Sequence, residues 1–530
     1  MRCSLLHDLL AATAAATPDA IALACDGRRY TYRDLDERAN ALAHALHERG
    51  VARGDRVVVF ADNSAETVIS FWGILKANAV ATLVHSQTKV EKLAYLLADT
   101  DARALITDRA HEAVYATAAR SARQLATVIV AGLDHATRTR LGHLPRVASF
   151  DQVTVPGSPV PPARRCIDKD LAALIYTSGS TGEPRGVMLT HRNMIAATAS
   201  VAEYLVPRPD DVILCVLPLA FSYGLYQIVL AFSCGARAVL HRSFAYPADV
   251  MRSVVEEKVT ALPGVPTMFA TILGLTTSTE LDLSTVRYVT NAGAALPTKH
   301  MRELRKLMPA ARIFSMYGMT ECKRCTYLPP EDFDRKPDSV GIAIPNTELW
   351  IVDEHGQRLG PGQVGELVVR GATVMCGYWR NPDLTAKKLR PGPIPGEHVL
   401  FTGDLGRLDD EGYLYFVGRM DDVIKSRGEK VSPVEVEATI LAIQGVREAA
   451  VIGVPDEILG AAIKAFVVLE PGATIDASAI LRECRARLES FKVPTNIEVR
   501  TTLPRNKNGK VQKSELALSI NHPERAHEYF

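Results

Sequence analysis

Hydrophobic positions in the first 330 residues alternate between helical and extended patterns. Across residues 31–50, apolar side chains are spaced by four and three positions and Gly50 follows, which predicts an amphipathic helix and its end. Extended apolar runs lie at residues 57–60 and 80–84, with a helical pattern between them. Similar extended runs recur at residues 171–176, 212–217, 259–262, 286–290 and 311–315. This alternation predicts parallel sheets covered by helices on both faces.

The pattern changes after residue 340. Three closely spaced strand patterns, LWIVD, GELVVRG and GYLYFVG, are separated by glycine-rich turns and predict an antiparallel, barrel-like portion. Beyond residue 421, a helical pattern is followed by AAVIGV, KAFVVL, a charged helix and IEVR, which indicates a small α+β domain. We therefore predict an α/β protein with a large N-terminal domain of residues 1–420 and a small C-terminal domain of residues 421–530.

The composition is that of an ordinary globular protein, with 47% hydrophobic and 23% charged residues in a chain of 530. The 61 Lys and Arg balance the 60 Asp and Glu, so the net charge of +1 provides no field for nucleic acid or an anionic membrane. No segment approaches about 18 uninterrupted apolar residues, so we predict no membrane span. Any partner must therefore be recognised by a local site and not by the overall charge of the protein.

The N-terminal segment and the cysteines indicate the cellular location of the protein and whether it binds zinc. His7 and Asp8 interrupt the apolar stretch that a secretory signal needs, so we expect a mature N-terminus. The nine scattered cysteines form no disulfide pattern and favour a reducing, cytoplasmic location. Cys322 and Cys325 form an isolated C-x-x-C pair, and zinc is disfavoured there because no second pair accompanies it.

The strand pattern at residues 171–176 runs directly into hydroxyl residues and glycines. This segment comprises Thr177, Ser178, Gly179, Ser180, Thr181 and Gly182. Glycines permit close approach of backbone N–H groups and the hydroxyls donate hydrogen bonds, a combination that suits a polyphosphate. Arg185 adds a positive charge able to pair with phosphate oxygens. The alternative is a flexible surface turn, but such turns rarely carry this density of donors after an apolar strand.

Two other nucleotide-binding motifs do not fit. A Walker A loop has Lys and then Ser or Thr after its second glycine, whereas Gly182 is followed by Glu183 and Pro184. No G-x-G-x-x-G follows a strand with a later acidic residue, which argues against a dinucleotide oxidoreductase. The loop is therefore predicted to bind phosphate in a different class of enzyme.

Five motifs occur in a fixed order along the chain. They are YTSGSTGEPRG at 176–186, MYGMTE at 316–321, TGD at 402–404, GRMDDVIKSRGEKVSP at 418–433 and LPRNKNGK at 503–510. With this set, nearly the whole chain resembles the adenylate-forming (ANL) superfamily, of the acyl-CoA synthetase type. The resemblance implies that ATP activates a carboxylic acid to an acyl adenylate with release of pyrophosphate, and that a thiol then takes the acyl group. It also implies a mobile C-terminal domain.

The MYGMTE motif is expected to serve the nucleotide. By resemblance, Tyr317 lies against the adenine, Thr320 lies near the phosphate as a catalytic residue, and Glu321 binds Mg²⁺, a hard cation that prefers oxygen ligands. The resemblance also counts Gly293 among the nucleotide-binding residues. Asp404 would accept hydrogen bonds from both ribose hydroxyls.

Three charged residues have both a catalytic and a structural interpretation. The resemblance directs Arg419 to the ribose beside Asp404, although an isolated Asp and Arg would ordinarily form surface turns or ion pairs. It makes Lys510 the mobile cation that bridges the acid and the α-phosphate, whereas the local sequence reads as a solvated charge run. Lys507 is the weaker candidate because no glycine precedes it.

The resemblance implies a domain rotation between the two half-reactions. Asp421 would be the hinge, and Gly428 would then face the thiol in place of Lys510. Lys430 stands where many relatives carry Arg, which leaves a phosphate-binding role for it open.

The segment 217–227 resembles the wall of the acid pocket, with Phe221 at its gate. Ser222 stands where amino-acid-activating relatives have the Asp that pairs with an ammonium group, so we predict a non-amino carboxylic acid. Lys323 and Arg324 follow Glu321, and Arg324 falls near a pocket-lining position. One of them is predicted to meet a polar or anionic group on the acid; the alternative is a solvated or structurally paired cation.

The leading interpretation is an AMP-forming acid–thiol ligase that uses ATP and Mg²⁺. CoA is slightly favoured over the phosphopantetheine arm of a separate carrier protein, since both present the same thiol. A luciferase-like oxygenase and a non-catalytic nucleotide-binding scaffold are the alternatives; the scaffold is disfavoured because Glu321, Asp404 and Lys510 are all chemically competent. The sequence leaves a monomer and a homodimer equally open.

Overall fold

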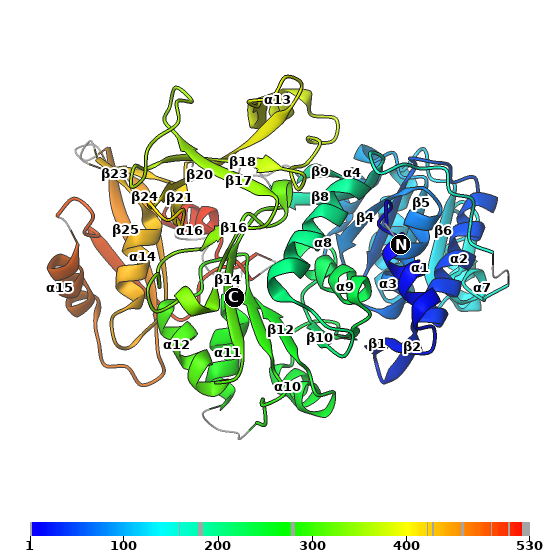
Figure 1. Cartoon of the computed structure of the whole chain (residues 1–530), viewed down its shortest axis with the longest axis horizontal. Helices are drawn as coiled ribbons and strands as arrows, with labels where there is room; N and C mark the ends of the chain where they lie inside the picture. The colour runs from blue at the N-terminus through cyan, green and yellow to red at the C-terminus, as the bar shows by residue number, and fades with distance from the viewer. Residues whose placement is uncertain are drawn as a thin grey trace.

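The structure, a computed structural model, describes residues 3–157, 160–178, 184–276, 281–420, 422–426, 429–456, 460–488, 490–506 and 509–521. Two large sheets, a smaller antiparallel sheet and a C-terminal α+β unit make up the fold (Figure 1). The predicted α/β class is confirmed. No helix in these ranges has the length and apolar character needed to cross a membrane.

A seven-stranded sheet has the order β7-β6-β5-β3-β4-β8-β9 and is parallel except for the antiparallel pair β8–β9. Its strands are β3 (Arg56–Ala61), β4 (Val80–His85), β5 (Ala104–Asp108), β6 (Thr127–Ala131), β7 (Val147–Ser149), β8 (Leu171–Ser178) and β9 (Pro184–Thr190). The helices in this part are α2 (Tyr32–Glu48), α3 (Ala65–Lys76), α4 (Val90–Asp99), η1 (Arg109–His111), α5 (Glu112–Ala118), η2 (Ala119–Ser121), α6 (His135–Arg140) and α7 (Phe150–Val153).

A nine-stranded sheet has the order β16-β15-β14-β13-β12-β10-β11-β1-β2, with a parallel centre and antiparallel pairs at both edges. Its strands are β1 (Ile21–Cys25), β2 (Arg28–Thr31), β10 (Val212–Cys215), β11 (Arg237–Leu240), β12 (Ala261–Gly264), β13 (Tyr288–Asn291), β14 (Arg312–Tyr317), β15 (Thr326–Leu328) and β16 (Ile342–Ala343). The helices in this part are α1 (Asp8–Ala16), α8 (His191–Leu205), α9 (Ser222–Cys234), α10 (Pro247–Glu256), α11 (Pro266–Thr276), α12 (Thr298–Leu307), η3 (Thr320–Cys322) and η4 (Pro330–Asp332).

The antiparallel portion predicted after residue 340 is a five-stranded sheet. It contains β17 (Thr347–Val352), β18 (Gly365–Gly371), β19 (Leu389–Pro391), β20 (His398–Leu408) and β21 (Leu414–Arg419), with α13 (Pro382–Lys388) inserted before β19. Both β18 and β21 pair with β20.

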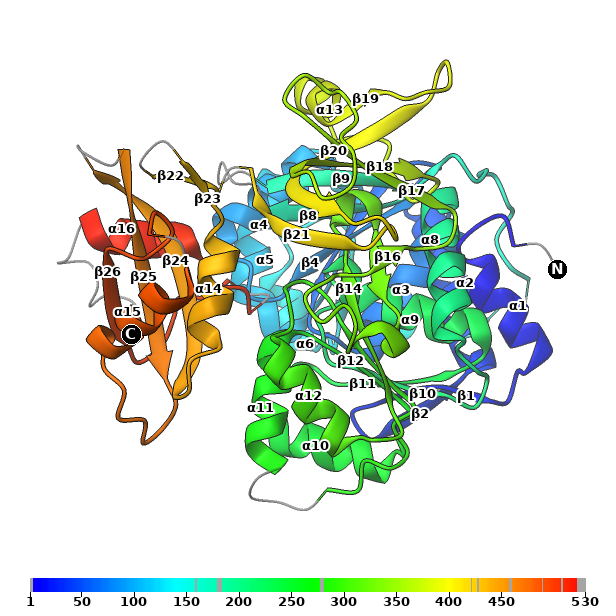
Figure 2. The ribbon, with the colours of Figure 1, turned by 60° about the vertical axis from the view of Figure 1, so that its left-hand side comes forward.

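The C-terminal unit stands at one end of the molecule (Figure 2). It comprises β22 (Ile424–Ser426), β23 (Glu429–Val431), α14 (Pro433–Leu441), β24 (Val446–Asp456), β25 (Gly460–Leu469), α15 (Ala477–Arg487), β26 (Asn496–Arg500) and α16 (Lys513–Asn521). Its hydrophobic cores draw only on residues from Ile424 onward. The domain boundary at residues 420 and 421 remains a prediction, because Asp421 lies outside the described residues.

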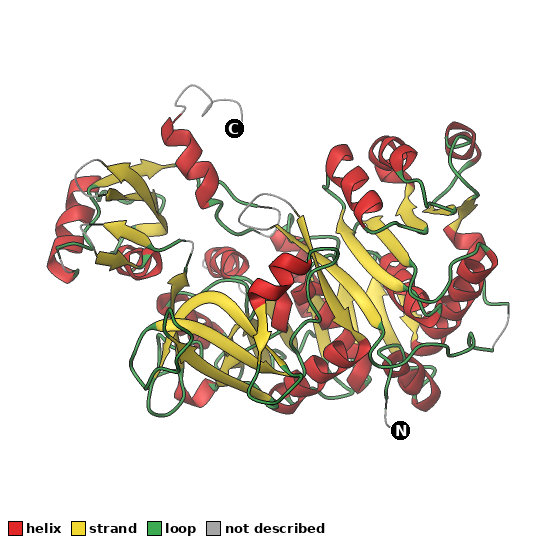
Figure 3. Cartoon of the chain, turned by 90° about the horizontal axis from the view of Figure 1, so that it is seen from above, coloured by secondary structure: helices red, strands yellow, loops and turns green. Residues whose placement is uncertain are grey.

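A local sequence signal sets the start of α2, and the packing of helices joins the two large sheets. Helix α2 begins with a capping box, in which Thr31 Oγ1 accepts a hydrogen bond from the Asp34 backbone N–H and the Asp34 carboxylate accepts one from the Thr31 N–H. The apolar face of α2 then packs on α3. Trp72 of α3 is fully buried and stacks on Phe232 of α9, with ring centroids 5.8 Å apart. Seen from above, helices lie on both sides of the sheets (Figure 3).

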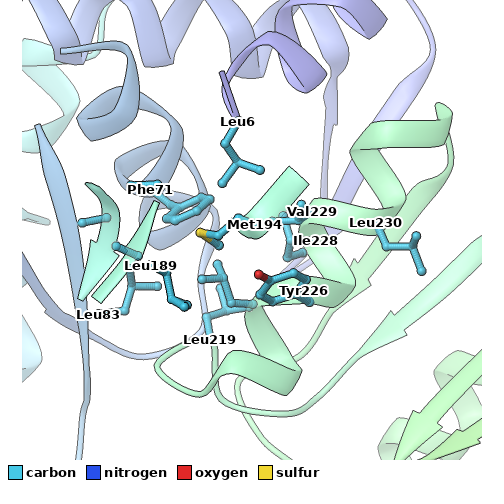
Figure 4. Packing of buried hydrophobic residues seen from close by; sticks show 14 of the residues in the cluster. Leu6, Phe71, Leu83, Leu189, Met194, Leu219, Tyr226, Ile228, Val229 and Leu230 are labelled. Atoms are coloured by element: carbon cyan, nitrogen blue, oxygen red, sulfur yellow. The ribbon is translucent and has the colours of Figure 1, made fainter. Parts of the chain in front are cut away.

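The central hydrophobic core lies where the two sheets meet. Figure 4 shows Leu6, Phe71 of α3, Met194 of α8 and Ile228 of α9 converging on it. Each of these side chains is at most 1% exposed. Burying such a side chain stabilises the fold by about 1.5–3 kcal/mol. This packing fixes the start of α9, and with it Phe221 and Ser222, relative to β8 and β14.

Candidate active site

One large cleft, of about 4740 Å³, runs from the two large sheets to the C-terminal unit. The described residues that line it include most of the predicted site: Thr177, Phe221, Ser222, Gly293, Tyr317, Thr320, Arg324, Asp404, Arg419 and Lys510. Residues separated by more than 300 positions in sequence therefore share one cleft. Gly179, Ser180, Thr181, Gly182, Asp421, Gly428 and Lys507 lie outside the described residues.

The predicted phosphate loop is held at both ends by a hairpin. Strand β8 ends at Ser178 and β9 begins at Pro184, and Thr177 pairs with Arg185 across the two strands. A Cβ on Gly186 would lie 3.0 Å from the Tyr176 ring, so only a glycine packs there without displacement. The hairpin thus holds the Thr177 and Arg185 backbones side by side at the base of the loop.

Asp404 and Tyr317 form the centre of the proposed nucleoside site. The Tyr317 hydroxyl donates to Asp404 Oδ2 over 2.5 Å. Asp404 is 7% exposed, and its Oδ1 has no hydrogen-bond partner in the described structure. Burial raises the pKa of Asp404, while the Tyr317 hydrogen bond and the positive charge of Arg419 act in the opposite direction. A buried acceptor without a donor costs about 1–3 kcal/mol, which a hydroxyl of a bound ribose would relieve.

Arg419 reaches this site because β20 and β21 pair. Asp404 and Arg419 are partners in the ladder, next to a register shift at Leu405 and Gly406. Arg419 Nε lies 3.6 Å from Asp404 Oδ1, too far for a good hydrogen bond but close enough for electrostatic attraction. The pair therefore forms an anionic acceptor with a cation beside it; the ribose roles of the two residues stay predictions.

Glu321 is positioned by a contact that the sequence did not indicate. Its Oε1 accepts a hydrogen bond of 2.8 Å from the Tyr378 hydroxyl, and its backbone carbonyl accepts one from the Met375 N–H. No cluster of three His, Cys, Asp or Glu side chains suited to a metal exists within the described ranges. The Sγ atoms of Cys322 and Cys325 lie buried, 3.0 Å apart.

Lys510 comes from the C-terminal unit and faces the cleft. Gly509, with φ +75°, turns the chain, and the Asn506 side chain accepts a hydrogen bond from the Lys510 N–H. A Cβ on Gly509 would lie 3.3 Å from Thr267 Oγ1 of α11, so this loop touches the N-terminal part. Enclosure in the cleft lowers the pKa of Lys510, and the nearby positive charge of Arg419 adds to the shift.

The C-terminal unit is also held by an ion pair between the two parts. Lys299 of α12 contacts Glu470 at 3.0 Å. Both side chains are about half exposed, so the pair contributes only about 0–1 kcal/mol. Such a weak contact permits the domain movement predicted from the resemblance.

On the acid side, Phe221 and Ser222 stand where β10 gives way to α9. The Phe221 ring lies 5.5 Å from the His85 ring. The Tyr223 hydroxyl is within 2.8 Å of Thr290, which ties α9 to β13. Lys323 and Arg324 are both buried, so the alternative of a solvated cation is wrong for them.

Lys388 and Tyr378 contact predicted site segments, and the sequence did not indicate either of them. Lys388 Nζ donates to the carbonyl of Thr402, the first residue of the TGD motif, over 3.0 Å. Burial lowers the pKa of Lys388, and Glu366 opposes that shift. The signal that could have marked Tyr378 is the GYWRNP segment, which joins glycine, two aromatic rings and a cation just after the β18 pattern.

This cleft brings the β8–β9 hairpin, Asp404 and Lys510 together, the arrangement that the resemblance to AMP-forming ligases predicts. The family models for AMP-binding enzymes match residues 10–379, and those for the AMP-binding enzyme C-terminal domain match residues 435–510. The chain belongs to this family. The predicted resemblance is confirmed, as is the class of an AMP-forming acid–CoA ligase acting on ATP, a carboxylic acid and CoA.

Relatives and solved structures agree along nearly the whole chain. The chain is 30% identical to the long-chain-fatty-acid–CoA ligase of Bacillus subtilis (strain 168), covering 96% of this chain and 94% of that one. It is 33% identical to the feruloyl-CoA synthase of Amycolatopsis sp, covering 94% and 96%. The anthranilate CoA ligase AuaEII, solved in complex with anthranoyl-AMP, is 28% identical with a TM-score of 0.89, covering 99% of this chain and 98% of that one. ATP-bound MatB from Rhodopseudomonas palustris is 28% identical with a TM-score of 0.85, covering 98% and 99%.

Proposed function

We propose that this enzyme joins a non-amino carboxylic acid to CoA through an acyl adenylate, with both parts of the chain contributing residues to each half-reaction. The observation that carries the proposal is the meeting of Asp404 and Lys510 in one cleft, from opposite sides. Asp404 offers a buried oxygen without a donor, suited to a ribose hydroxyl. Lys510 brings a positive charge to the same space.

In the first half-reaction, an oxygen of the acid attacks the α-phosphorus of ATP and pyrophosphate leaves. Negative charge accumulates on the α-phosphate oxygens, and Lys510 neutralises it as a point charge. Thr320, the first residue of η3, lies shortly after β14 and orients the phosphate, while Asp404 and Arg419 hold the ribose. Most of the rate gain comes from this alignment, because the reaction needs no covalent group of the protein.

Glu321 is the proposed protein ligand for Mg²⁺. Glu321 follows Thr320 of the cleft, and one oxygen of its carboxylate is held by Tyr378, which fits an ion that keeps several waters and is bound through one or two carboxylates and the substrate's phosphates. When bound, the ion would screen the charge of the triphosphate. Among the described residues Glu321 would therefore act without a protein cage of further acidic ligands.

In the second half-reaction, the thiol attacks the acyl carbon and AMP leaves. We propose that the C-terminal unit rotates about Asp421, withdraws Lys510 and presents the segment around Gly428 to the thiol. The half-exposed Lys299–Glu470 pair supports this movement, since breaking it costs little. CoA is the acceptor; a carrier protein's phosphopantetheine arm remains a second possible thiol.

The acid itself is proposed to lack an amino group. Ser222 supplies no carboxylate for an ammonium group, and the buried cations Lys323 and Arg324 would repel one. The relatives named long-chain-fatty-acid–CoA ligase and feruloyl-CoA synthase support an acid that is joined to CoA. A cytoplasmic location also remains a prediction, which the nine free cysteines support.

The test uses the purified enzyme with ATP, Mg²⁺, CoA and a broad panel of carboxylic acids. We expect acid-dependent release of AMP and pyrophosphate, with a CoA thioester identified by mass. α-Amino acids should be the poorest substrates. Formation of ADP and phosphate, or turnover that does not depend on an acid, would show that the proposal is wrong.

A further inference from the structure

Two adjacent cations lie buried at the acid side of the cleft. Lys323 and Arg324 follow η3 and precede β15, and each is only 4% exposed. Both line the cleft that contains Thr320, and both also border a small internal cavity of about 10 Å³ between α8 and α9. Both side chains lie over rings of α9, the helix that begins at Ser222, so we assign them to the acid side of the cleft.

Neither cation has an anionic partner in the described structure. Lys323 Nζ lies over the rings of Tyr226, at 4.6 Å, and Tyr223, at 5.3 Å. The Arg324 guanidinium lies 4.5 Å from the Tyr223 ring centroid, and its Nε and Nη1 make no hydrogen bond. Ring faces attract cations, but much less strongly than a carboxylate does in a desolvated site.

A buried lysine elsewhere in this chain shows the contrast. Lys76 is 5% exposed, and its Nζ donates to Asp36 over 2.6 Å and to Asn40 over 2.7 Å. There the fold supplies the oxygen atoms that a buried ammonium needs. Lys323 and Arg324 have no carboxylate partner among the described residues; Arg324 has the Tyr223 hydroxyl beside it, while its Nε and Nη1 make no hydrogen bond. Both residues line a cleft that admits a ligand.

The backbone holds Arg324 in this place at a conformational cost. Its φ is +66°, in the left-handed region that a non-glycine residue adopts with difficulty. A Cβ on Gly318 would lie 2.7 Å from Arg324 Cα, and the Cys325 N–H donates to the Tyr317 carbonyl over 2.9 Å. The segment after the MYGMTE motif is thus folded tightly back on it, which holds the Arg324 backbone against Gly318 and Tyr317 of the motif.

The charge of the pair agrees with an incoming anion. The guanidinium of Arg324 keeps its charge in any protein environment. An oxyanion beside it would supply acceptors for the Arg324 Nε and Nη1 groups, which make no hydrogen bond in the described structure.

We propose that the acid substrate carries a second carboxylate, which binds Arg324 and Lys323 while the first carboxylate is activated beside Thr320 and Lys510. The preferred substrates are therefore dicarboxylic acids, not alkyl or aryl monoacids. This inference rests on the proposed function and adds the chemical class of the acid to it. An inorganic oxyanion has the same chemistry as the second carboxylate, so the experiment separates the two sources.

The first arm compares matched acids of equal length: a dicarboxylic acid, its monomethyl ester and its monoamide. Acid-dependent pyrophosphate release gives kcat/KM for each, over chain lengths from three to ten carbons and for aromatic diacids. We expect the best diacid to exceed its ester by at least about 30-fold, since a desolvated charge pair contributes this much or more. Equal or better use of the esters overturns the proposal.

The second arm adds inorganic phosphate to assays with monoacids. If a free oxyanion fills the pocket, phosphate should raise the rate with monoacids and inhibit the diacids weakly. That result overturns the proposal, because the second charge would then come from solution. We expect no activation by phosphate.

The third arm uses variants. Arg324→Met should lower kcat/KM for the diacid at least about 30-fold and leave the value for the ester within about threefold, chiefly through KM. Arg324→Lys should recover part of the preference. The matched control is Arg312→Met, which removes an exposed cation that also lies over a ring, that of Phe314 at 5.1 Å. Activity with the ester shows that a variant is folded, and an equal loss with both acids overturns the proposal.

Different results would contradict the proposed function and the preference for dicarboxylic acids. Acid-dependent exchange of pyrophosphate into ATP with monoacids but not with diacids would leave the proposed function standing and remove only this inference. If no acid of either class supports exchange, the proposed function falls and this inference falls with it.

Discussion

Replacing Lys510 with methionine tests whether one mobile charge separates the two half-reactions. The side chain can be removed without disturbing its loop, because the loop is held by the Lys510 backbone N–H on Asn506 and by the turn at Gly509. Methionine keeps a similar length and removes the charge. The substitution therefore probes electrostatics at the α-phosphate and little else.

The expected magnitude follows from the surroundings of Lys510. Its side chain is enclosed in the cleft yet accessible to solvent, which corresponds to an effective dielectric constant nearer to 20 than to 80. Two unit charges about 4 Å apart then interact by about 4 kcal/mol, which equals a factor of about 1000 in rate. We expect this loss in acyl-adenylate formation.

The assay measures each half-reaction alone. Single-turnover release of pyrophosphate from ATP and acid reports adenylation, and thioester formation from presynthesised acyl-AMP and CoA reports transfer. Lys510→Met should slow the first about 1000-fold and the second less than about threefold. Lys306→Met removes an exposed lysine of α12 that lines the same cleft and should change neither. Equal loss in both half-reactions, or an adenylation loss below about fivefold, refutes the reasoning.

Three further outcomes are expected. Asp404→Asn should raise KM for ATP by about 10- to 100-fold and reduce the discrimination against 2′-deoxy-ATP; an unchanged preference for ATP would remove Asp404 from the ribose site. Because the pKa of Lys510 is lowered, adenylation should decline as the pH rises, below the value of about 10.4 for free lysine, and this decline should be missing in the Lys510→Met profile. Gly224→Ala places a Cβ 2.3 Å from the Pro218 carbonyl oxygen and should destabilise the fold by about 1–3 kcal/mol in thermal unfolding. The control Gly274→Ala meets nothing within 4 Å and should be neutral or stabilising by up to about 1 kcal/mol; equal effects of the two would contradict the packing argument.

Much of the fold follows from the sequence because its elements carry local signals. The spacing in residues 31–50 corresponds to α2, and the apolar run at 171–176 lies within β8. The return strand β9 was not predicted, since residues 184–190 were seen as part of a loop motif and the pairing across that loop is not local. The order of the strands could not be predicted for the same reason. Strand β4 lies beside β8 although some 85 residues separate them, and the hydrophobic pattern carries no information about which distant strands pair.

Site residues that belong to family motifs were predicted from the sequence. Contacts that arise from the packing of distant segments were not. Asp404 and Arg419 meet only because β20 and β21 pair with a shifted register. The hydrogen bond from Tyr378 to Glu321 joins positions 57 residues apart. The burial of Lys323 and Arg324 could not be predicted either. Their sequence shows only two adjacent charges after a motif, whereas their burial depends on packing against α8 and α9.

The central claim is that an oxygen of the acid attacks the α-phosphorus of ATP in this cleft. Carboxylate oxygens labelled with ¹⁸O give the most direct test, because the bridging oxygen of acyl-AMP comes from the acid and leaves with AMP when CoA attacks. After one turnover with unlabelled ATP and CoA, mass spectrometry should find one ¹⁸O in each AMP and none in pyrophosphate. Label in inorganic phosphate, or AMP without label, would contradict the account.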